Sequence, residues 1–554
     1  MIAIDLLIYF LVFWAIIHII VRTIQQKFPD KKAHLSRNTL DRNLPLHTQQ
    51  LKPKSTTIES SVFNVRITTT ALNPFFKSLA LKAPKFWRIW FTIGAWVGMF
   101  AMVCGVGLMV FVGGKLMLEF LGFHSHQHNG FHGMRRSLSV EHETFEENSF
   151  INFVLPGVTL PLSHAGYVLI GLFICGIIHE AGHAIAAANE QVTISSTGVF
   201  IQILYPGAFV DIPIRNLALL PCAKQIRIFC AGVWHNAVVF ALGWLLISFC
   251  VIPSAMQFMG WKSTDGFGVN VVNVDQDTDL YSEANPSGTI TRLDDYFLNG
   301  SSLEQWTKYL RQHEQLDYNP PIKPGFCSMH SKEASLECCA ITADHPFGNA
   351  DDKELVCFQY AEEREPDQRL TCLPMNTIST PDSNRCTLNA DCPSNGRCVM
   401  PFISNESPNR VVRIYYKPPA WENASEKIVL YWGEFIGLWE SVEVNTLQPR
   451  WWFIPTWIPI LCETLLRYIT SFSLALCIFN ILPAFQLDGY YAMSTALLFW
   501  FGEEEREHVM LGMGRSKIEK QRRKLEKIVA NSVTVLLAWV IIGSLIAILV
   551  GFEH

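Results

Sequence analysis

Long apolar runs constrain the fold of this 554-residue chain more than any other feature of its sequence. A helix needs about 20 mostly apolar residues to cross a bilayer. A shorter apolar run at 481–501 contains Asp488 and is expected to be a half-helix or re-entrant piece buried in protein. We therefore predict a polytopic α-helical membrane protein with re-entrant elements and about six transmembrane helices. The six runs lie at 2–21, 89–118, 166–188, 228–252, 457–479 and 528–550.

Charged segments between these runs predict which side of the membrane each loop faces. Residues 22–88 hold thirteen Lys or Arg, and the loop 503–527 contains the cluster Lys520-Gln-Arg-Arg-Lys524. Since basic loops stay in the cytosol, both segments are expected there, and the long polar region 253–452 falls in the lumen. The net charge of −5 gives nucleic-acid binding no electrostatic support, so we expect no nucleic-acid partner.

The polar region 253–452 carries two independent marks of an oxidising compartment. Three glycosylation sequons begin at Asn299, Asn405 and Asn423. Eight of the fifteen cysteines also lie there, and an even, dense cluster predicts a disulfide framework. A zinc-binding module is the alternative, although the spacings lack a repeated Cys-x-x-Cys pair. The eight are Cys327, Cys338, Cys339, Cys357, Cys372, Cys386, Cys392 and Cys398.

The run at 166–188 contains the motif His179-Glu-Ala-Gly-His183. Histidines at i and i+4 lie on one face of a helix and can share one zinc ion. Zinc lowers the pKa of a bound water, and Glu180 is placed to take its proton. Polar side chains inside a membrane cost several kcal/mol unless they are paired or bound to metal. A zinc site is therefore favoured over the alternative, a polar cluster that packs helices together.

A catalytic zinc has three protein ligands, so a third is needed outside this motif. Asp488, within Asn480-Ile-Leu-Pro-Ala-Phe-Gln-Leu-Asp-Gly489, is the well-placed acidic candidate in a distant apolar segment. Pro483 and Gly489 predict broken helix geometry, which can aim the carboxylate inward. The alternative role of Asp488 is an N-cap for the following helix.

An apolar His-Glu-x-x-His helix followed by a Leu-Asp-Gly element resembles the site-2 protease family of intramembrane metalloproteases. The resemblance implies one catalytic Zn2+ held by His179, His183 and Asp488, with Glu180 as the base. Gly232-Val-Trp-His-Asn236 is similar to a family Gly-x-x-x-Asn element. For Asn236 this implies substrate binding or oxyanion stabilisation. An interhelical hydrogen bond is the alternative.

The luminal region also resembles known modules. Gly266-Phe-Gly-Val and the later Asn285-Pro-Ser-Gly resemble a PDZ-like fold, which can bind a peptide at a sheet edge. Glu337-Cys-Cys339 lies in a Cys-rich insertion similar to that of animal family members. We therefore expect a luminal PDZ-like α/β domain, formed by 253–316 and 404–452, with the Cys-rich insertion at 317–403. The segment 189–215 is expected to offer a strand to an unwound substrate.

The remaining segments complete the expected organisation. A luminal loop at 119–164 contains a cluster of four histidines between 124 and 132, which suits a solvated loop better than a weak metal site. The segments are transmembrane helices 1–21, 89–118 and 528–551, cytosolic segments 22–88 and 503–527, and a catalytic core at 165–252 and 453–502. The histidines are His124, His126, His128 and His132.

The resemblance implies that the substrates are single-span membrane proteins already trimmed by a luminal protease. They include membrane-anchored transcription factors for sterol and stress signalling, cut in the Golgi or the endoplasmic reticulum. Two other kinds of protein could contain the same intramembrane His, Glu and Asp side chains. One is a membrane zinc transporter, and the other is a non-catalytic membrane scaffold. A transporter has no need of Glu180 as a base or of a disulfide domain. All three candidate metal ligands and the candidate base are present, which argues against a scaffold.

Overall fold

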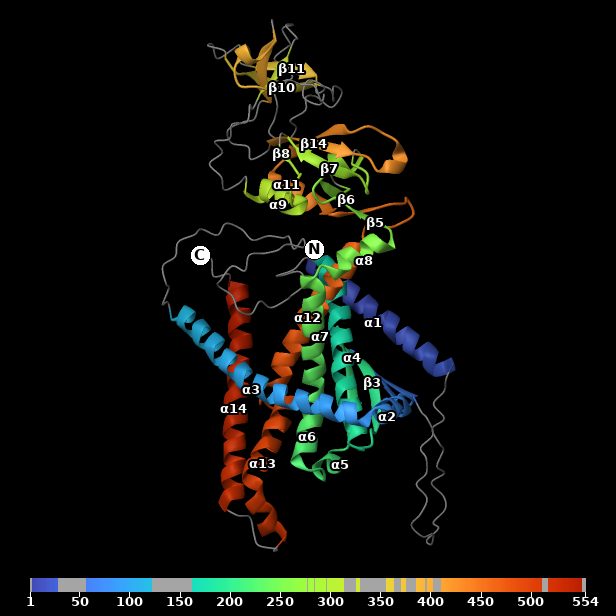
Figure 1. Cartoon of the computed structure of the whole chain (residues 1–554), viewed down its shortest axis with the longest axis vertical. Helices are drawn as coiled ribbons and strands as arrows, with labels where there is room; N and C mark the ends of the chain where they lie inside the picture. The colour runs from blue at the N-terminus through green and yellow to red at the C-terminus, as the bar shows by residue number, and fades with distance from the viewer. Residues whose placement is uncertain are drawn as a thin grey trace. The chain divides into compact units, whose positions relative to one another are not determined.

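A computed structural model describes most of the chain and divides it into two compact units (Figure 1). Unit 1 is Met1–Phe249 with Thr464–His554, and unit 2 is Cys250–Glu463. The expected His-rich loop, the sequon at Asn405, and Cys338 and Cys339 lie outside the described residues. These residues are 2–27, 56–121, 162–312 (without 277, 283 and 295), 325–328, 355–362, 370–374, 385–401 (without 394 and 395), 410–510 and 517–550.

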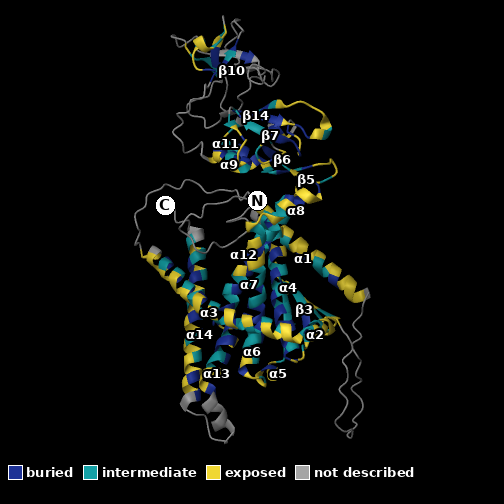
Figure 2. Ribbon diagram, in the orientation of Figure 1, coloured by how far each residue is buried: buried dark blue, intermediate teal, exposed yellow. Residues whose placement is uncertain are grey.

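The expected membrane spans are confirmed as helices. Within the described parts of the chain, six helices are long and apolar enough to cross a membrane. Large apolar side chains on them lie exposed, such as Phe100 and Val103 at 71% and 73% (Figure 2). Lipid explains this exposure, because water would penalise so large an apolar surface. The helices are α1 (Ile2–Lys27), α3 (Pro84–Phe120), α4 (Ala165–Asn189), α7 (Ala231–Ser248), α12 (Ile458–Ile481) and α14 (Lys517–Val550).

Unit 1 also contains a four-stranded antiparallel sheet of order β1-β2-β3-β4. Its first two strands, β1 (Thr56–Ser61) and β2 (Asn64–Thr69), lie in the segment expected to be a simple cytosolic connector. Its last two, β3 (Ser196–Gln202) and β4 (Tyr205–Asp211), follow α4. β-branched residues in β1 and β2 favour strands. The pairing of β2 with β3 makes the connector part of the same sheet as β4.

The chain breaks between α12 and α13 (Asp488–Met510), as Pro483 predicts. Residues 482–487 form turns, and Gln486 has a left-handed φ of 69°. Asp488 is therefore the first residue of a new helix. α13 is not among the helices apolar enough to span a membrane in the described residues. It packs instead against α6 (Cys222–Phe229) and α14.

Three short helices complete the described part of unit 1: α2 (Asn73–Lys82), α5 (Ile214–Ala218) and α6. α6 leads into α7, which packs closely along α4 (Figure 1). Glycine makes this approach possible at Gly182. A Cβ there would lie 2.6 Å from the carbonyl oxygen of Ala231, well inside van der Waals contact.

Unit 2 contains an α/β body with strand order β15-β14-β7-β6-β16. Buried Trp306 and Leu310 of α9 (Ser302–Gln312) and Leu438 of α11 (Phe435–Ser441) pack into its core. β6 follows the Gly266-Phe-Gly sequence and is paired on both sides, with β7 and with β16, so a peptide strand cannot join this sheet at β6. The PDZ-like character stays a prediction. The strands are β6 (Val269–Val274), β7 (Thr289–Leu293), β8 (Tyr296–Phe297, paired with β7), β14 (Arg410–Lys417), β15 (Lys427–Gly433) and β16 (Val442–Asn445).

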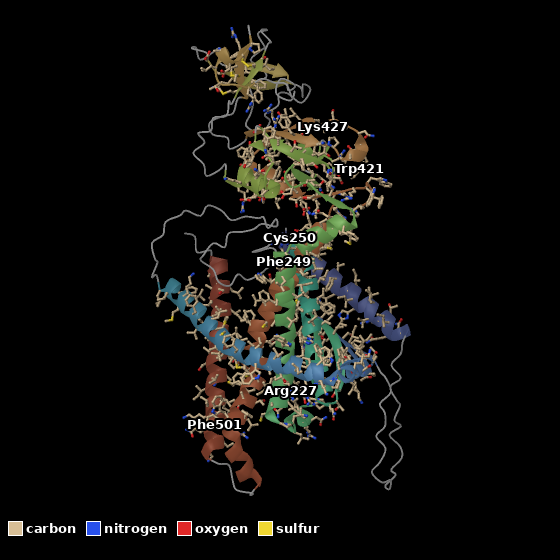
Figure 3. The ribbon with its side chains drawn as sticks, viewed as in Figure 1. Arg227, Phe249, Cys250, Trp421, Lys427 and Phe501 are labelled. Atoms are coloured by element: carbon tan, nitrogen blue, oxygen red, sulfur yellow. A yellow bond between two sulfur atoms is a disulfide. The ribbon has the colours of Figure 1, made fainter. Side chains whose placement is uncertain are left out.

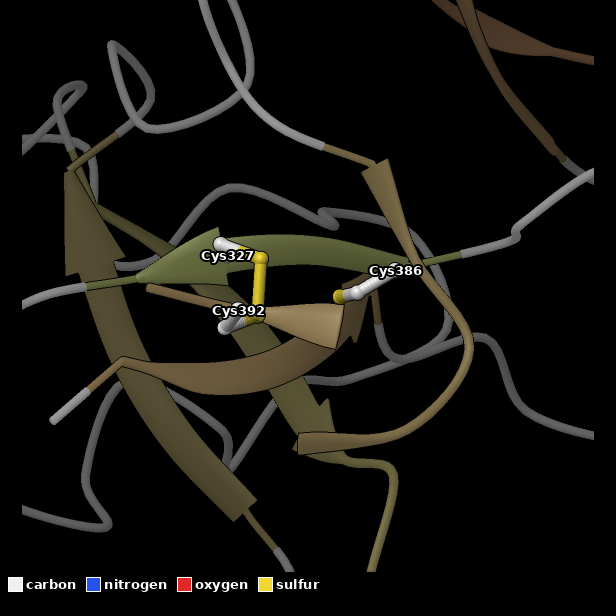
Figure 4. A group of neighbouring side chains, drawn as sticks. All are labelled: Cys327, Cys386 and Cys392. Carbon is white, nitrogen blue, oxygen red and sulfur yellow. A yellow bond between two sulfur atoms is a disulfide. The ribbon is translucent and has the colours of Figure 1, made fainter. Parts of the chain in front are cut away.

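The Cys-rich segment forms a second antiparallel sheet, of order β11-β10-β13-β9-β12. A disulfide joins Cys327 to Cys392, as Figure 4 shows, and a second joins Cys386 to Cys398. Disulfide formation is thus confirmed for these four cysteines. Their sulfurs are not available as thiolates, so the zinc-module alternative fails for them. The strands are β9 (Gly325–Ser328), β10 (Leu355–Tyr360), β11 (Leu370–Pro374), β12 (Arg385–Cys386) and β13 (Arg397–Pro401).

Candidate metal centre

Two histidines of α4 and the first residue of α13 meet at one point. Asp488 Oδ2 lies 3.0 Å from His179 Nε2 and 3.1 Å from His183 Nε2, and the two Nε2 atoms lie 3.2 Å apart. Both histidines are buried. Ligand atoms on a tetrahedral zinc with bonds of about 2.0–2.1 Å lie about 3.3 Å from one another. The three donors therefore have nearly the spacing that a shared zinc ion requires.

The hydrogen bond of His183 identifies which ring nitrogen carries its proton. Nδ1 lies 2.8 Å from the carbonyl oxygen of Ile228, which can only accept, so Nδ1 donates. In a neutral imidazole Nε2 then carries no proton and has a free lone pair. That lone pair faces Asp488 Oδ2, which is also a hydrogen-bond acceptor, so the two atoms repel each other. A cation bound between them would remove this repulsion. The donor set of two imidazoles and a carboxylate is one that catalytic zinc uses.

Asn236 of α7 is completely buried beside the other histidine. Its Nδ2 lies 3.2 Å from His179 Nδ1, and its Oδ1 has no hydrogen-bond partner among the described residues. A half-turn of the amide exchanges the two atoms at little steric cost. In that orientation Oδ1 accepts from Nδ1–H, and Nε2 of His179 becomes a ligand atom. The orphaned oxygen therefore fits a metal-bound state of His179.

Gly232 leaves the space that an ion needs. A Cβ on this residue would lie 2.7 Å from His179 Nε2 and still closer to His183 Nε2. Any other side chain would enter the space among the three donors. In the sequence, only the Gly-x-x-x-Asn spacing singles out Gly232. Nothing in the sequence predicts that it lies beside both ligand histidines.

Glu180 lies next to the cluster on α4 and has a partner of its own. Its Oε2 accepts a 2.9 Å hydrogen bond from the backbone N–H of Val210 in β4. One turn earlier, the position of a Cβ on Gly176 is 4.0 Å from the backbone nitrogen of Ala208. α4 therefore runs along the outer edge of β4, the strand edge that β3 does not occupy.

An ion-pair cluster fixes the C-terminal end of α4. Buried Glu190 accepts from Arg227 at 2.7 Å and 2.8 Å and pairs with Lys224 at 3.2 Å. Arg227 and Lys224 lie on α6, and the carbonyl that holds His183 belongs to Ile228, the residue after Arg227. Thus the cluster sets the register between the motif helix and its neighbour. Sequence patterns gave no signal for this cluster, since Glu190 lies more than 30 residues from both of its basic partners.

Comparison with known proteins identifies the family. The model of peptidase family M50 matches residues 167–511, which is more than half of the chain. The chain belongs to peptidase family M50. The matched range includes all but the first two residues of α4, together with α7, unit 2 and α13, so it contains every member of the centre. The M50 assignment makes the protein a metalloprotease, and its apolar helices make it a multi-pass membrane protein.

One relative supports a narrower placement within M50. The chain is 27% identical over 380 residues to a membrane-bound transcription factor site-2 protease homolog of Arabidopsis thaliana. This similarity covers 62% of the chain and 72% of the plant protein. The resemblance to site-2 proteases is thereby confirmed. The M50 family uses zinc, and the His-His-Asp cluster is a site that suits it.

Proposed function

We propose that this protein is an intramembrane zinc endopeptidase of the site-2 type. His179, His183 and Asp488 hold the ion, and Glu180 is the general base. The observation that carries the proposal is the convergence of three donor atoms within 3.0–3.2 Å, on apolar helices, with a carboxylate next in sequence. Zinc held there makes water a stronger acid and polarises a carbonyl.

Glu180 is oriented for proton transfer by β4. The Val210 N–H holds Oε2, which leaves Oε1 to take a proton from water and to pass it to the leaving amine. An ionised carboxylate among apolar helices needs such a donor, because an unpaired charge there is costly. The same bond fixes the distance between Glu180 and the zinc ligands on α4.

The substrate is proposed to be an extended stretch of a transmembrane helix. Helical carbonyls are already hydrogen-bonded, so a peptide bond must leave the helix before hydrolysis. β4 supports this step because it is an edge strand and its Val210 contacts the base. A substrate strand that pairs with the part of this edge beside the α4 contact would pass near the metal centre, and the pairing would satisfy its backbone groups inside the membrane.

Single-span membrane proteins already trimmed in the lumen are the substrates that we propose. The name of the plant relative refers to a membrane-bound transcription factor, and substrates of this class suit an enzyme that releases a cytosolic fragment. Sterol and stress regulators in the Golgi or the endoplasmic reticulum belong to this proposal. The disulfides of unit 2 support a luminal location for that unit.

The test compares wild type with Glu180→Gln in cells that lack the endogenous enzyme, using a luminally trimmed single-span substrate. Exposed Glu304 on α9 provides the control Glu304→Gln. We expect Glu180→Gln to keep its zinc and to lose about 10²–10⁴-fold in cleavage, the usual share of a general base. Cleavage equal to that of Glu304→Gln would overturn the assignment. Zinc uptake by vesicles containing wild type would support the transporter instead.

A further inference from the structure

Unit 2 has an uncharged aromatic surface formed by two segments far apart in sequence. One is α8 (Val251–Met259), and the other is the turn at 451–457. We call this surface the aromatic foot. Its members are unusually exposed, with Phe258 at 94% and Trp452 at 77%. They are Phe258, Met259, Trp451, Trp452, Phe453 and Trp457.

The two segments form one rigid body. β5 (Trp261–Ser263) pairs with β17 (Leu447–Pro449), and the Arg450 N–H donates to the Gly260 carbonyl at 3.0 Å. Gly260 has a left-handed φ of 127°, and a Cβ on it would lie 2.8 Å from the Trp451 ring. Buried Met256, Trp261 and Leu447 form a small core beneath them. The exposed aromatic side chains are therefore presented by a packed structure.

Water is a poor partner for this surface. The sequence contains no charged residue from 249 to 261 or from 451 to 462. Exposed Lys262 directly follows the first segment and exposed Arg450 directly precedes the second, and both are basic. Glu463 follows the second segment within α12. Exposed apolar patches of this kind mark contact with a membrane or a protein. Basic residues beside aromatic ones suit the headgroup layer of a bilayer in particular.

Chain connectivity selects lipid as the partner. α7 ends at Ser248, so only two residues separate it from α8, at the Phe249–Cys250 junction in Figure 3. Trp457 directly precedes α12, which begins at Ile458. Both α7 and α12 are candidate membrane spans. Each half of the foot is thus tied within a few residues to the end of a span.

We propose that the aromatic foot is embedded in the interfacial layer of the bilayer and anchors unit 2 to the membrane surface. Aromatic rings are favoured at the depth of the headgroups, and a short helix with one apolar face lies in that plane. Lys262 and Arg450 contact lipid phosphates there. This anchoring does not depend on the protease activity proposed above.

A photoreactive benzoylphenylalanine at position 258 or 452 tests the proposal in the full-length protein, reconstituted in phosphatidylcholine–phosphatidylserine vesicles. Exposed Tyr281 of the same unit, at 51%, is the matched control position. We expect several-fold more lipid adduct at 258 and 452 than at 281. Adducts formed with protein instead, or lipid labelling no higher than at 281, would overturn the proposal.

A second measurement guards against an effect of the probe itself. This measurement uses protein without the photoreactive residue, in vesicles of lipids brominated near the headgroup. Bromine should quench a smaller share of the tryptophan fluorescence in Trp452→Leu than in wild type, because the variant lacks one tryptophan at the depth of the headgroups. Half-buried Trp421 in unit 2 provides the control Trp421→Leu, for which we expect a smaller change. An equal change in the two variants would contradict the interfacial position of Trp452.

Discussion

Three functional side chains of the centre are each held by a partner that is not itself a ligand. The carbonyl of Ile228 holds His183, Asn236 lies on His179, and the Val210 N–H holds Glu180. Such partners fix the tautomer and the direction of a ligand before metal binds. Zinc affinity therefore depends on residues that never contact zinc.

Asn236 provides the sharpest test of this dependence. We expect Asn236→Leu to weaken zinc binding by about 10–100-fold, the usual effect of losing such a partner. Asn236→Asp, which keeps an acceptor for Nδ1–H, should retain more affinity. Competition with a chelator measures both. Wild-type affinity in Asn236→Leu would show that Asn236 does not position His179 and would leave it a role towards the substrate.

Gly232 makes a steric prediction. In Gly232→Ala the new methyl group would occupy the space among the ligand atoms, so zinc content should fall well below one ion per chain. Gly107 of α3 has no atom within 4 Å of its Cβ position, and Gly107→Ala is the matched control. Elemental analysis of the purified proteins measures both. A full complement of zinc in Gly232→Ala would mean that the ion lies elsewhere.

At the scale of elements, α4 packs against both α7 and β4. α7 helps to position the metal ligands, and β4 positions the base. Val210 donates from the outer edge of β4, where a strand tolerates proline. Pro206 already occupies the same strand, and alternation places it on the same edge as Val210. The contribution of this one N–H can therefore be isolated.

Val210→Pro removes the donor and keeps an extended backbone. Hydrogen bonds to charged groups contribute about 1.5–3 kcal/mol, so we expect cleavage to fall about 10–100-fold with zinc retained. Val210→Ala keeps the N–H and should cleave nearly as wild type does. If the two variants cleave at the same rate, the N–H does not orient Glu180.

The elements differ in how far sequence could predict them. The spans were predictable because crossing a bilayer is a local demand on about 20 residues. The break before Asp488 was predictable from Pro483. The four-stranded sheet of unit 1 was not predictable, because β2 and β3 pair although they lie more than 120 residues apart, and short strands carry weak local signals.

The centre shows the same division. Spacing placed His179 and His183 on one face, and the need for a third ligand selected Asp488. The bond between Glu180 and Val210 and the fit of Gly232 depend on packing between distant segments. Packing of this kind leaves no periodic pattern in the sequence.

At the scale of the molecule, the described residues contain two clusters of metal-ligating side chains, one in each unit. His179, His183 and Asp488 form the cluster of unit 1, and Cys327, Cys386 and Cys392 that of unit 2. The three cysteines are engaged in disulfides. We therefore expect a single zinc environment, in which all protein ligands are nitrogen or oxygen atoms.

Zinc-edge X-ray absorption on the purified full-length protein tests this claim most directly. We expect one zinc per chain with two imidazole nitrogens and carboxylate oxygen at about 2.0–2.2 Å, and loss of that signal in His183→Ala. A sulfur shell at about 2.3 Å, or a spectrum unchanged in His183→Ala, would contradict an intramembrane His-His-Asp centre.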